Sequence, residues 1–147
     1  PAGHYVPVVL DSRYVYVAGQ IPRVGNLIAV TGAAGRDATL EQARDAARIC
    51  AMRLLTLLQS TLGSLDRVLQ VMRMNVYVQS AGDFTQQSEV ADAASDLLVK
   101  VLEDAGAHTR TSIGTYQLPK NATVEIDLVV AYEAEPINMT TMMSTLN

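Results

Sequence analysis

The chain has 147 residues, of which 49% are hydrophobic and 18% charged, a composition that suits one globular domain with its own core. Its formal net charge is −4 and its Lys and Arg residues form no basic run, which argues against a nucleic-acid partner. No apolar run approaches the ~20 residues that a membrane-spanning helix needs. The lone cysteine, Cys50, allows no intramolecular disulfide, so we expect a cytoplasmic domain with no membrane partner.

The first third of the chain predicts an antiparallel meander. Two β-rich runs, 5–10 and 14–18, are separated by the turn-forming residues 11–13. Pro7 cannot donate a hydrogen bond to a neighbouring strand, which places the first strand at a sheet edge. After a Gly-Asn turn, we expect a short third strand at 27–30.

Two amphipathic helices are predicted further along. Thr39 and Gln42 form a capping-box pattern and Gly63 is a plausible stop, so the first helix is expected over 40–62. The second helix follows the break at residues 80–83 and is expected to end near residue 105. Its inward-facing side chains should be Val90, Ala94, Leu97, Leu98, Val101 and Leu102.

Residues 68–79 alternate between two sets of side chains, which predicts a strand. The set expected to face the helices is Val68, Met72, Met74, Val76 and Val78. The opposite set is Leu69, Val71, Arg73, Asn75, Tyr77 and Gln79. The full order of three strands, helix, strand, helix and two strands favours an α+β fold with both helices on one face of a sheet.

The sheet face away from the helices is expected to be too apolar for water alone, which predicts a homo-oligomer. Its apolar members are Leu69, Val71, Tyr77, Val129 and Ala131. The domain itself is expected to span residues 1–133. The C-terminal tail, 134–147, shows no clear period, and its methionines leave open either docking on a neighbour or a loosely held tail.

The stretch from Arg110 to Asp127 is the candidate for the chemistry. It predicts two strands joined by a turn at 118–121, which would pair Gly114 with Glu125 and place Arg110 on the same sheet face as Glu125. An arginine can bind a carboxylate through two parallel hydrogen bonds, and a carboxylate in a partly closed site can activate water. With backbones on the order of 13 Å apart, the two side chains would hold a small anion and a water between them.

A structural interpretation stands beside this one, because an arginine that opens a strand and a glutamate on the outer face of another strand are more often surface or interface ion-pair residues. His4 and His108 are far apart and no cluster has metal-ligand spacing, so we expect no metal and no cofactor. The helix dipole is an adequate explanation for His108 near a helix end. Cys50 lies on the apolar side of the first helix, where a buried and unreactive thiol is expected.

Several short motifs, taken together, resemble those of one protein family. They are Gly19-Gln20-Ile21-Pro22, Gly63-Ser64-Leu65-Asp66-Arg67-Val68, Asp83-Phe84, the run from Arg110 to Gly114, Leu118-Pro119 and Val124-Glu125-Ile126. In this order, over about residues 5–133, the chain is similar to the RidA (YjgF) family. Residues 80–84, 94–98 and 108–110 are closer to a longer and less characterised branch of it.

The resemblance implies a chorismate-mutase-like fold, with a mixed β-sheet of about six strands and two helices on one face, assembled as a homotrimer. It also implies a small carboxylate ligand at each subunit interface and hydrolysis of reactive 2-imino or enamine acids, such as 2-iminobutanoate, to 2-keto acids and ammonia. By this analogy Arg110 binds the substrate carboxylate, Glu125 positions and activates water, and Tyr5 lines the cleft. Backbone groups at Gly19 and Ser112 complete the pocket.

The chain departs from the main deaminase group of that family at three cleft positions. Ala18 stands where Ser or Thr is usual, Ser112 where Cys is frequent, and Ser88 where Asn is frequent. These changes leave open a second function, a non-catalytic trimeric module that binds a small carboxylate metabolite or a protein partner. Ribonuclease activity, which part of the family carries in its name, is disfavoured by the acidic net charge, the single Phe and the lack of Trp.

Overall fold

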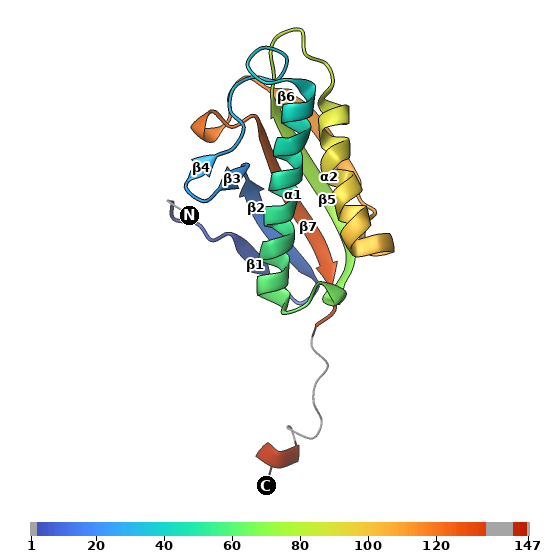
Figure 1. The fold of residues 1–147 in the computed structure, drawn as a ribbon. Helices are drawn as coiled ribbons and strands as arrows, with labels where there is room; N and C mark the ends of the chain where they lie inside the picture. Colours follow the sequence, from blue (N-terminus) through green and yellow to red (C-terminus); the bar gives the residue numbers. More distant parts are fainter. Residues whose placement is uncertain (1–2, 135–142, 147) are drawn as a thin grey trace.

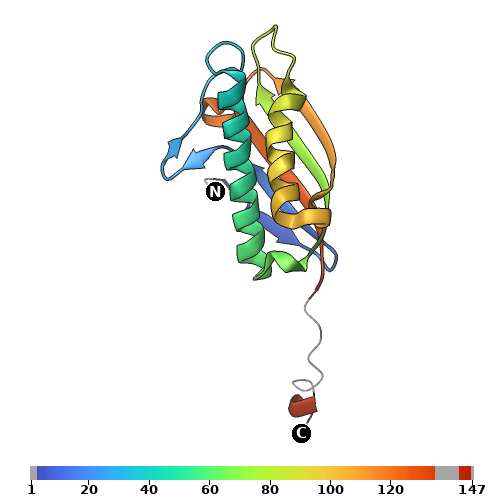
Figure 2. The same ribbon diagram turned by 45° about the vertical axis from the view of Figure 1, so that its right-hand side comes forward.

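Two α-helices, α1 (Leu40–Leu62) and α2 (Gln87–Leu102), lie side by side on one face of a five-stranded sheet (Figures 1 and 2). The computed structural model describes residues 3–134 and 143–146, so the prediction for the tail falls largely outside the described residues. The helix-on-sheet layers confirm the predicted α+β class. No helix in the described part of the chain combines the length and apolarity of a membrane span.

The antiparallel edge of the sheet is built from the start of the chain. β1 (Val8–Leu10) pairs with β2 (Tyr14–Gln20) across a turn in which the Asp11 carboxylate accepts two backbone hydrogen bonds of 2.7 Å. The predicted third strand does not join this sheet. Instead β3 (Arg23–Val24) and β4 (Leu27–Ile28) form a separate two-stranded hairpin. The main sheet therefore has five strands rather than about six.

Helix α1 begins and ends where its capping residues predict. The Thr39 hydroxyl accepts a hydrogen bond from the Gln42 amide, the Gln42 side chain accepts one from the Thr39 amide, and Gly63 has a left-handed φ of 82°. A buried stripe faces the sheet, and its small members let the helix approach closely. The stripe consists of Ala43, Ala46, Ala47, Cys50, Ala51, Leu54, Leu55, Leu58 and Leu62.

β5 (Val68–Gln79) has the predicted bounds and lies inside the sheet. Its predicted alternation is wrong at one place, because Val71 is buried while Met72 is 41% exposed. Two shifts in the pairing with β7 (Val124–Tyr132) occur near the start of β5. A shift of this kind is a β-bulge, in which one strand has an extra, unpaired residue. The side chains that follow the extra residue then point to the opposite face of the sheet from the one that simple alternation predicts. The sequence pattern contains no signal for these shifts, since they depend on the partner strand.

The predicted hairpin between the last two strands is wrong. The strand order is β1-β2-β7-β5-β6, so β5 separates β7 from β6 (Thr109–Thr115), and β5 and β6 run parallel. Parallel neighbours need a long crossover, which α2 supplies. The chain then crosses the end of β5, where the buried Gln79 side chain accepts a hydrogen bond from the Leu118 amide and donates one to the Asn121 side chain, each at 2.7 Å.

Helix α2 is shorter than predicted. It ends at Leu102, and the 3₁₀ turn Glu103–Gly106 leads toward β6. Val101, predicted to face inward, is 44% exposed. A Cβ at Gly106 would lie 2.4 Å from the Leu98 carbonyl oxygen, so the close contact between this turn and α2 requires glycine.

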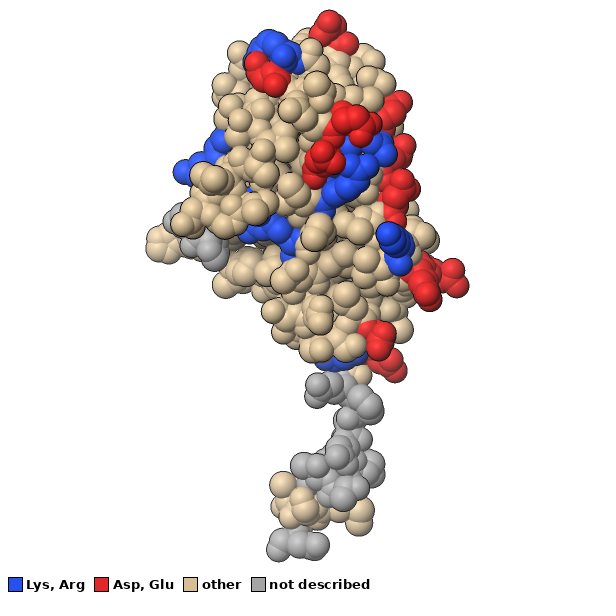
Figure 3. Space-filling model, viewed as in Figure 1, with Lys and Arg blue, Asp and Glu red and all other residues tan. Residues whose placement is uncertain are grey.

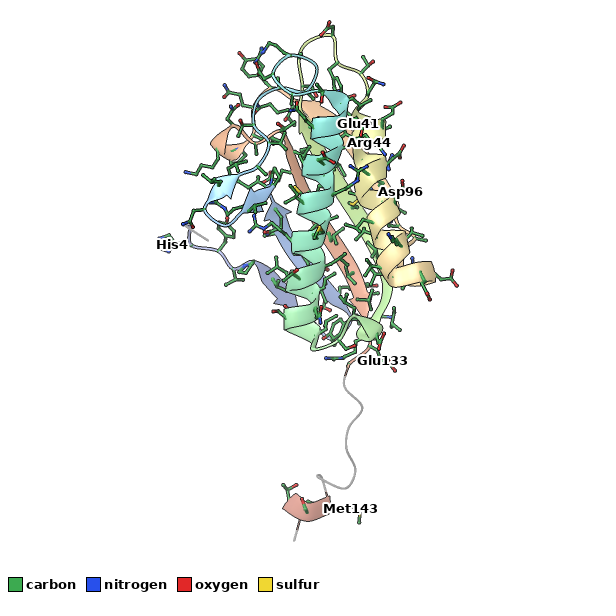
Figure 4. The ribbon with its side chains drawn as sticks, viewed as in Figure 1. His4, Glu41, Arg44, Asp96, Glu133 and Met143 are labelled. Atoms are coloured by element: carbon green, nitrogen blue, oxygen red, sulfur yellow. The ribbon has the colours of Figure 1, made fainter. Side chains whose placement is uncertain are left out.

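An arginine joins the two helices near their N-terminal ends. Arg44 lies 3.7 Å from Glu41, one turn earlier on α1, and donates a hydrogen bond to the Glu89 carbonyl of α2. Figure 4 shows Arg44 and Glu41 together at this end of α1. Because Glu41 is exposed, the ion pair contributes only about 0–1 kcal/mol, and burial of the apolar stripes holds the helices in place.

Candidate functional site

A cavity of about 730 Å³ opens beside the end of β2, between the N-terminal arm and α1. Segments that are distant in the sequence meet there: the arm, the end of β2, β3, α1, the turn before β7, and β7 itself. The lining residues are Tyr5, Pro7, Gly19, Gln20, Ile21, Arg23, Arg53, Leu57, Pro119, Lys120 and Glu125. Three of the predicted site residues, Tyr5, Gly19 and Glu125, therefore share one cavity.

Glu125 has room in this cavity because of a glycine on the neighbouring strand. The pairing of β2 with β7 shifts near the end of β2, where Gly19 lies. A Cβ at Gly19 would be 3.0 Å from the Glu125 carboxyl carbon. The predicted hairpin would have placed Gly114 opposite Glu125, but a Cβ at Gly114 would instead meet Gln87 of α2. Gly19 rather than Gly114 lies beside Glu125 because β7 has β2, and not β6, as a neighbour in the sheet.

The surroundings of Glu125 make its carboxylate a stronger base than that of an exposed glutamate. Burial raises the pKa of its carboxyl group above the ordinary value, and the negative charge of Asp127 raises it further. Burial also raises the pKa of Asp127, although the Asn75 side chain, which donates a hydrogen bond of 2.8 Å, and the Arg73 charge oppose the increase. A general base works best when its pKa lies near the operating pH, so Glu125 is suited to accept a proton from water.

Arg110 faces the other side of the sheet. It pairs with Met74 across β5 and β6, and Met74 is fully buried on the face that the helices cover. Glu125 pairs with Tyr77, which has the opposite orientation on β5. The predicted common face of Arg110 and Glu125 is therefore wrong. Side-chain parity across a hairpin does not apply here, since β6 and β7 are not adjacent.

The Arg110 guanidinium is held against α2 by three groups. Nη1 donates to Asp92 Oδ1 at 2.8 Å and to Ser95 Oγ at 3.0 Å, and Nη2 donates to the Ser88 carbonyl oxygen at 3.4 Å. The Arg110 side chain is only 22% exposed. Within one chain, this arginine is thus paired and lies away from the Glu125 cavity.

His108 extends the network around Arg110. Its Nδ1 lies 2.6 Å from the Gly106 carbonyl oxygen, and its Nε2 lies 2.8 Å from Ser95 Oγ. Because a carbonyl only accepts, Nδ1 of the neutral ring donates, and Nε2 accepts the Ser95 hydroxyl proton. The Ser95 oxygen is then free to accept from Arg110. His108 therefore has a structural role that the helix dipole alone did not predict.

Comparison with known proteins places this fold in a family. The family model described as Endoribonuclease L-PSP matches residues 1–132. The chain belongs to this family, also called RidA or YjgF. Protein TCP17 of Trypanosoma cruzi is 41% identical over 131 residues, which cover 88% of this chain and 82% of that protein. The family that the sequence motifs indicate is thereby confirmed.

Solved structures of other proteins agree with the RidA fold. Atu1372 of Agrobacterium tumefaciens, described as a protein with unknown function, has a TM-score of 0.87 and 38% identity, covering 90% of this chain and 84% of that chain. Escherichia coli TdcF with bound serine has a TM-score of 0.63 and 20% identity, covering 90% of this chain and 91% of that chain. At that identity, TdcF shows the shared fold alone.

The remaining predicted residues of the RidA-like site divide between the two regions. Ala18 adjoins the cavity, and its amide donates to the Pro7 carbonyl of the N-terminal arm at 2.8 Å. Ser88 contacts Arg110 through its carbonyl oxygen, and Ser112 lies on β6, paired with Val76. One chain therefore brings Tyr5, Gly19 and Glu125 to one cavity, with Ala18 next to Gly19 on β2. It separately joins Arg110 to Ser88, and Ser112 lies two residues after Arg110 on β6.

Sequence reasoning missed four charged residues in these regions. Arg23, Arg53 and Lys120 line the Glu125 cavity, and Asp92 pairs with Arg110. Nothing in the amphipathic pattern of α1 distinguishes Arg53 from a solvated arginine. Lys120 carries only the weak signal of its position in the predicted turn at 118–121, where the structure gives it a positive φ of 59°.

Neither metal binding nor thiol chemistry has a site in the described residues. No group of three or more His, Cys, Asp or Glu side chains there could hold a metal ion. Cys50 is buried in α1, with Sγ 3.8 Å from the Val124 carbonyl oxygen. Burial raises the pKa of this thiol far above its usual range, so it stays protonated and unreactive. This agrees with the buried thiol that the sequence predicts.

Proposed function

We propose that this RidA-family protein hydrolyses reactive 2-imino or enamine acids to 2-keto acids and ammonia. Glu125 carries the proposal: it is a half-buried carboxyl group with a raised pKa, on the wall of an open cavity of about 730 Å³. A small planar acid and a water fit in this space. The reaction needs no cofactor to activate the substrate, because the carbon of a protonated imine is already electrophilic.

In the proposed reaction Glu125 acts first as a base and then as an acid. Its carboxylate removes a proton from water while the water oxygen bonds to C2 of the protonated imine, and the C=N double bond becomes single. Glu125 then returns the proton to nitrogen. The C2–N bond breaks, ammonia takes up the remaining hydroxyl proton as ammonium, and the 2-keto acid is released.

The substrate carboxylate needs a cation, and the family resemblance assigns that role to Arg110. Arg110 and Glu125 face opposite sides of the sheet in one chain, so a complete site requires a second copy. Arg110 lies on β6, an edge strand, which can approach the cavity of a neighbouring copy. The homotrimer that the resemblance implies supplies such an interface three times.

The open sheet face supports this assembly. Val9 and Tyr16 are direct cross-strand neighbours and both are exposed, while Ile113 is exposed on β6. Val129 continues the row beside Tyr16. An apolar strip that crosses several strands is typical of a surface that a partner covers, and burial of this strip against another copy would stabilise the oligomer.

A non-catalytic module that binds a small carboxylate is the second candidate, and Arg110 favours it. Its guanidinium already has Asp92 as an ionic partner at 2.8 Å. A substrate carboxylate must compete with Asp92 for the same N–H groups. A protein that binds its ligand only weakly and performs no chemistry is consistent with such an occupied arginine.

Keto-acid release from imino acids generated in situ by an amino-acid oxidase tests the proposal. Acceleration over the spontaneous rate, lost in Arg110→Ala, would support the deaminase. No acceleration across several side chains would reject it. If a 2-keto acid then raises Tm in the parent but not in Arg110→Ala, the binding module is the better description. RNA cleavage that persists unchanged in Arg110→Ala would indicate a contaminating nuclease.

A further inference from the structure

Three cations line the Glu125 cavity without pairing with its acid. They are Arg23, Arg53 and Lys120, and Glu125 is the only acidic residue on the described cavity wall. The ion pairs within the described residues use other arginines, namely Arg36, Arg44, Arg48 and Arg110. The charges on this wall therefore have no counterion in the described part of the same chain.

Glu125 does not neutralise these cations. Burial and the Asp127 charge raise the pKa of Glu125, whereas a guanidinium or ammonium group in contact with it would lower that pKa. The cations and the acid therefore line one cavity, and none of the ion pairs within the described residues joins them. The space between them suits a ligand that presents its reacting carbon to Glu125 and a negative group to the cations.

The cationic wall also runs against the charge of the whole chain, which is −4. Figure 3 shows Lys and Arg side chains in a hollow between the N-terminal arm and α1, whereas Asp and Glu gather on the flank formed by α2. Local positive charge in a concave site of an acidic protein attracts small anions more strongly than an open surface does.

The backbone fixes where two of these cations stand. Arg53 Nη1 donates to the Ile21 carbonyl oxygen at 2.9 Å, which ties the guanidinium to the end of β2 and leaves other N–H groups for a ligand. Lys120 follows Pro119 in a turn whose next residue, Asn121, is bonded to the Gln79 side chain. Groups that are already in position lose less entropy when they bind a ligand.

The space extends beyond the immediate surroundings of Glu125. A groove of about 410 Å³ adjoins the cavity and shares Arg23 and Arg53 with it, together with Gln20 and Leu57. These two arginines therefore stand where the cavity continues past the end of β2. A substrate with only three or four carbons would leave this part unfilled, whereas a longer substrate would bring its far end to the arginines.

We propose that the cavity selects substrates with a second anionic group, distal to the reacting carbon, and that Arg23, Arg53 and Lys120 bind that group. The inference rests on the proposed function. With Arg110 of a second copy on the first carboxylate and Glu125 at C2, the preferred substrate class is the 2-imino dicarboxylic acids.

A matched pair of substrates tests the preference. The imino acids derived from glutamate and from norvaline have chains of equal length and differ in the distal carboxylate. We expect the dicarboxylic imine to have a kcat/KM at least about tenfold higher. The ratio should fall toward one in Arg23→Gln and Lys120→Gln. The control Arg36→Gln removes an exposed arginine outside the cavity and should leave the ratio unchanged.

Binding of the products separates this inference from the deaminase proposal. Calorimetry with 2-oxoglutarate and 2-oxopentanoate, its analogue without the distal carboxylate, requires no turnover. Suppose that no imino acid is hydrolysed, that 2-oxoglutarate binds more tightly than 2-oxopentanoate, and that this difference in affinity is lost in Arg23→Gln and Lys120→Gln. The site for the distal anionic group is then supported and the deaminase proposal is rejected. If both imines are hydrolysed equally well, and both keto acids bind equally well, the deaminase proposal stands and the subsite falls.

A third outcome would also overturn the subsite. The cations could bind acidic side chains of a neighbouring copy instead of a ligand. In that case Arg23→Gln and Lys120→Gln would change the oligomeric mass measured by light scattering and leave the substrate ratio and the 2-oxoglutarate affinity as in the parent. Arg53 is not used for this test, because its substitution also removes the hydrogen bond to Ile21.

Discussion

The arginine on the β6 edge strand and the cations of the Glu125 cavity differ in their ionic partners. At the β6 edge, Arg110 is paired with Asp92 at 2.8 Å. Beside β2, Arg23 and Lys120 line a cavity together with Glu125, and no ion pair links them to it. A charge that is paired within its own chain mainly serves the fold, whereas an unpaired charge on a cavity wall is available to a ligand. One chain therefore leaves the cations of the Glu125 cavity available to a ligand, whereas it pairs Arg110 with its own Asp92.

Replacement of Glu125 should have the largest effect on the cavity side. Glutamine has nearly the same shape but cannot accept a proton, so Glu125→Gln is expected to lower kcat by about 10²–10⁴-fold. Steady-state release of keto acid measures the change. Glu41→Gln makes the same replacement at an exposed position on α1 and should retain full turnover. A Glu125→Gln variant with more than a tenth of the parent kcat would remove Glu125 from the mechanism.

A methyl group at Gly19 should have the next largest effect. Its Cβ would lie 3.0 Å from the Glu125 carboxyl carbon, so the carboxylate must move away from its position. We expect Gly19→Ala to lower kcat by about tenfold to a hundredfold, the cost of a displaced catalytic group. Gly82→Ala is the matched control, since a Cβ there meets nothing within 4 Å. Equal kinetics for the two variants would contradict the placement of Glu125.

A smaller effect is expected at the Arg110 edge. Asp92→Asn removes an anion that competes with substrate for Arg110, so KM should fall a few-fold with little change in kcat. Stability should change by less than about 1 kcal/mol, because Asp92 is largely exposed. Asp45→Asn removes the corresponding partner of Arg48 on α1 and should leave KM unchanged. A higher KM in Asp92→Asn would show that Asp92 positions Arg110 rather than competing for it.

The acidic limb of the pH–rate profile should move only modestly when Asp127 is changed. The proposed mechanism requires ionised Glu125, whose pKa is raised first by burial and second by the charge of Asp127. Asp127→Asn removes the second cause and leaves the first, so the acidic limb of kcat/KM should shift toward lower pH. An unchanged limb would show that Asp127 does not act on the catalytic group.

The same pKa has a consequence for folding. Between the ordinary value near 4.5 and the higher value in the folded state, the folded protein binds more protons at Glu125 than the unfolded chain does. Stability from this group therefore falls as pH rises through that interval. Thermal unfolding should find Glu125→Gln equal to its parent below the interval and more stable above it. A variant less stable than its parent at neutral pH would contradict this sign.

Local signals were sufficient for several elements. Helix α1 has the predicted bounds because Thr39, Gln42 and Gly63 act within a few residues of the helix ends they define. β5 also has its predicted bounds, Val68–Gln79. The exchange of Val71 and Met72 between faces was beyond such signals, because it depends on how β5 pairs with β7.

The site could be predicted only in part. Residue chemistry and family motifs single out Glu125 and Arg110, but not how they are arranged. The assumed hairpin failed because two chain segments joined by a short connection need not be neighbours in a sheet. Here Gln79 binds the connection as it crosses the end of β5, and β5 itself lies between β6 and β7. That contact joins residues about forty positions apart, beyond the reach of any local pattern.

The amino-acid sequence by itself determined the α+β class, the bounds of α1 and β5, and the family, and it singled out Glu125 and Arg110 as candidates for the site. These depend on helix and strand periodicity, capping residues and short motifs, which are properties of neighbouring residues. Only the tertiary structure decided that Gly19 leaves space for the Glu125 side chain and that Asp92 forms an ion pair with Arg110. It also decided that Arg23, Arg53 and Lys120 line the cavity of Glu125 without an ion pair to it. Those facts depend on strand order and on which distant side chains meet, and the packing of the whole sheet sets both.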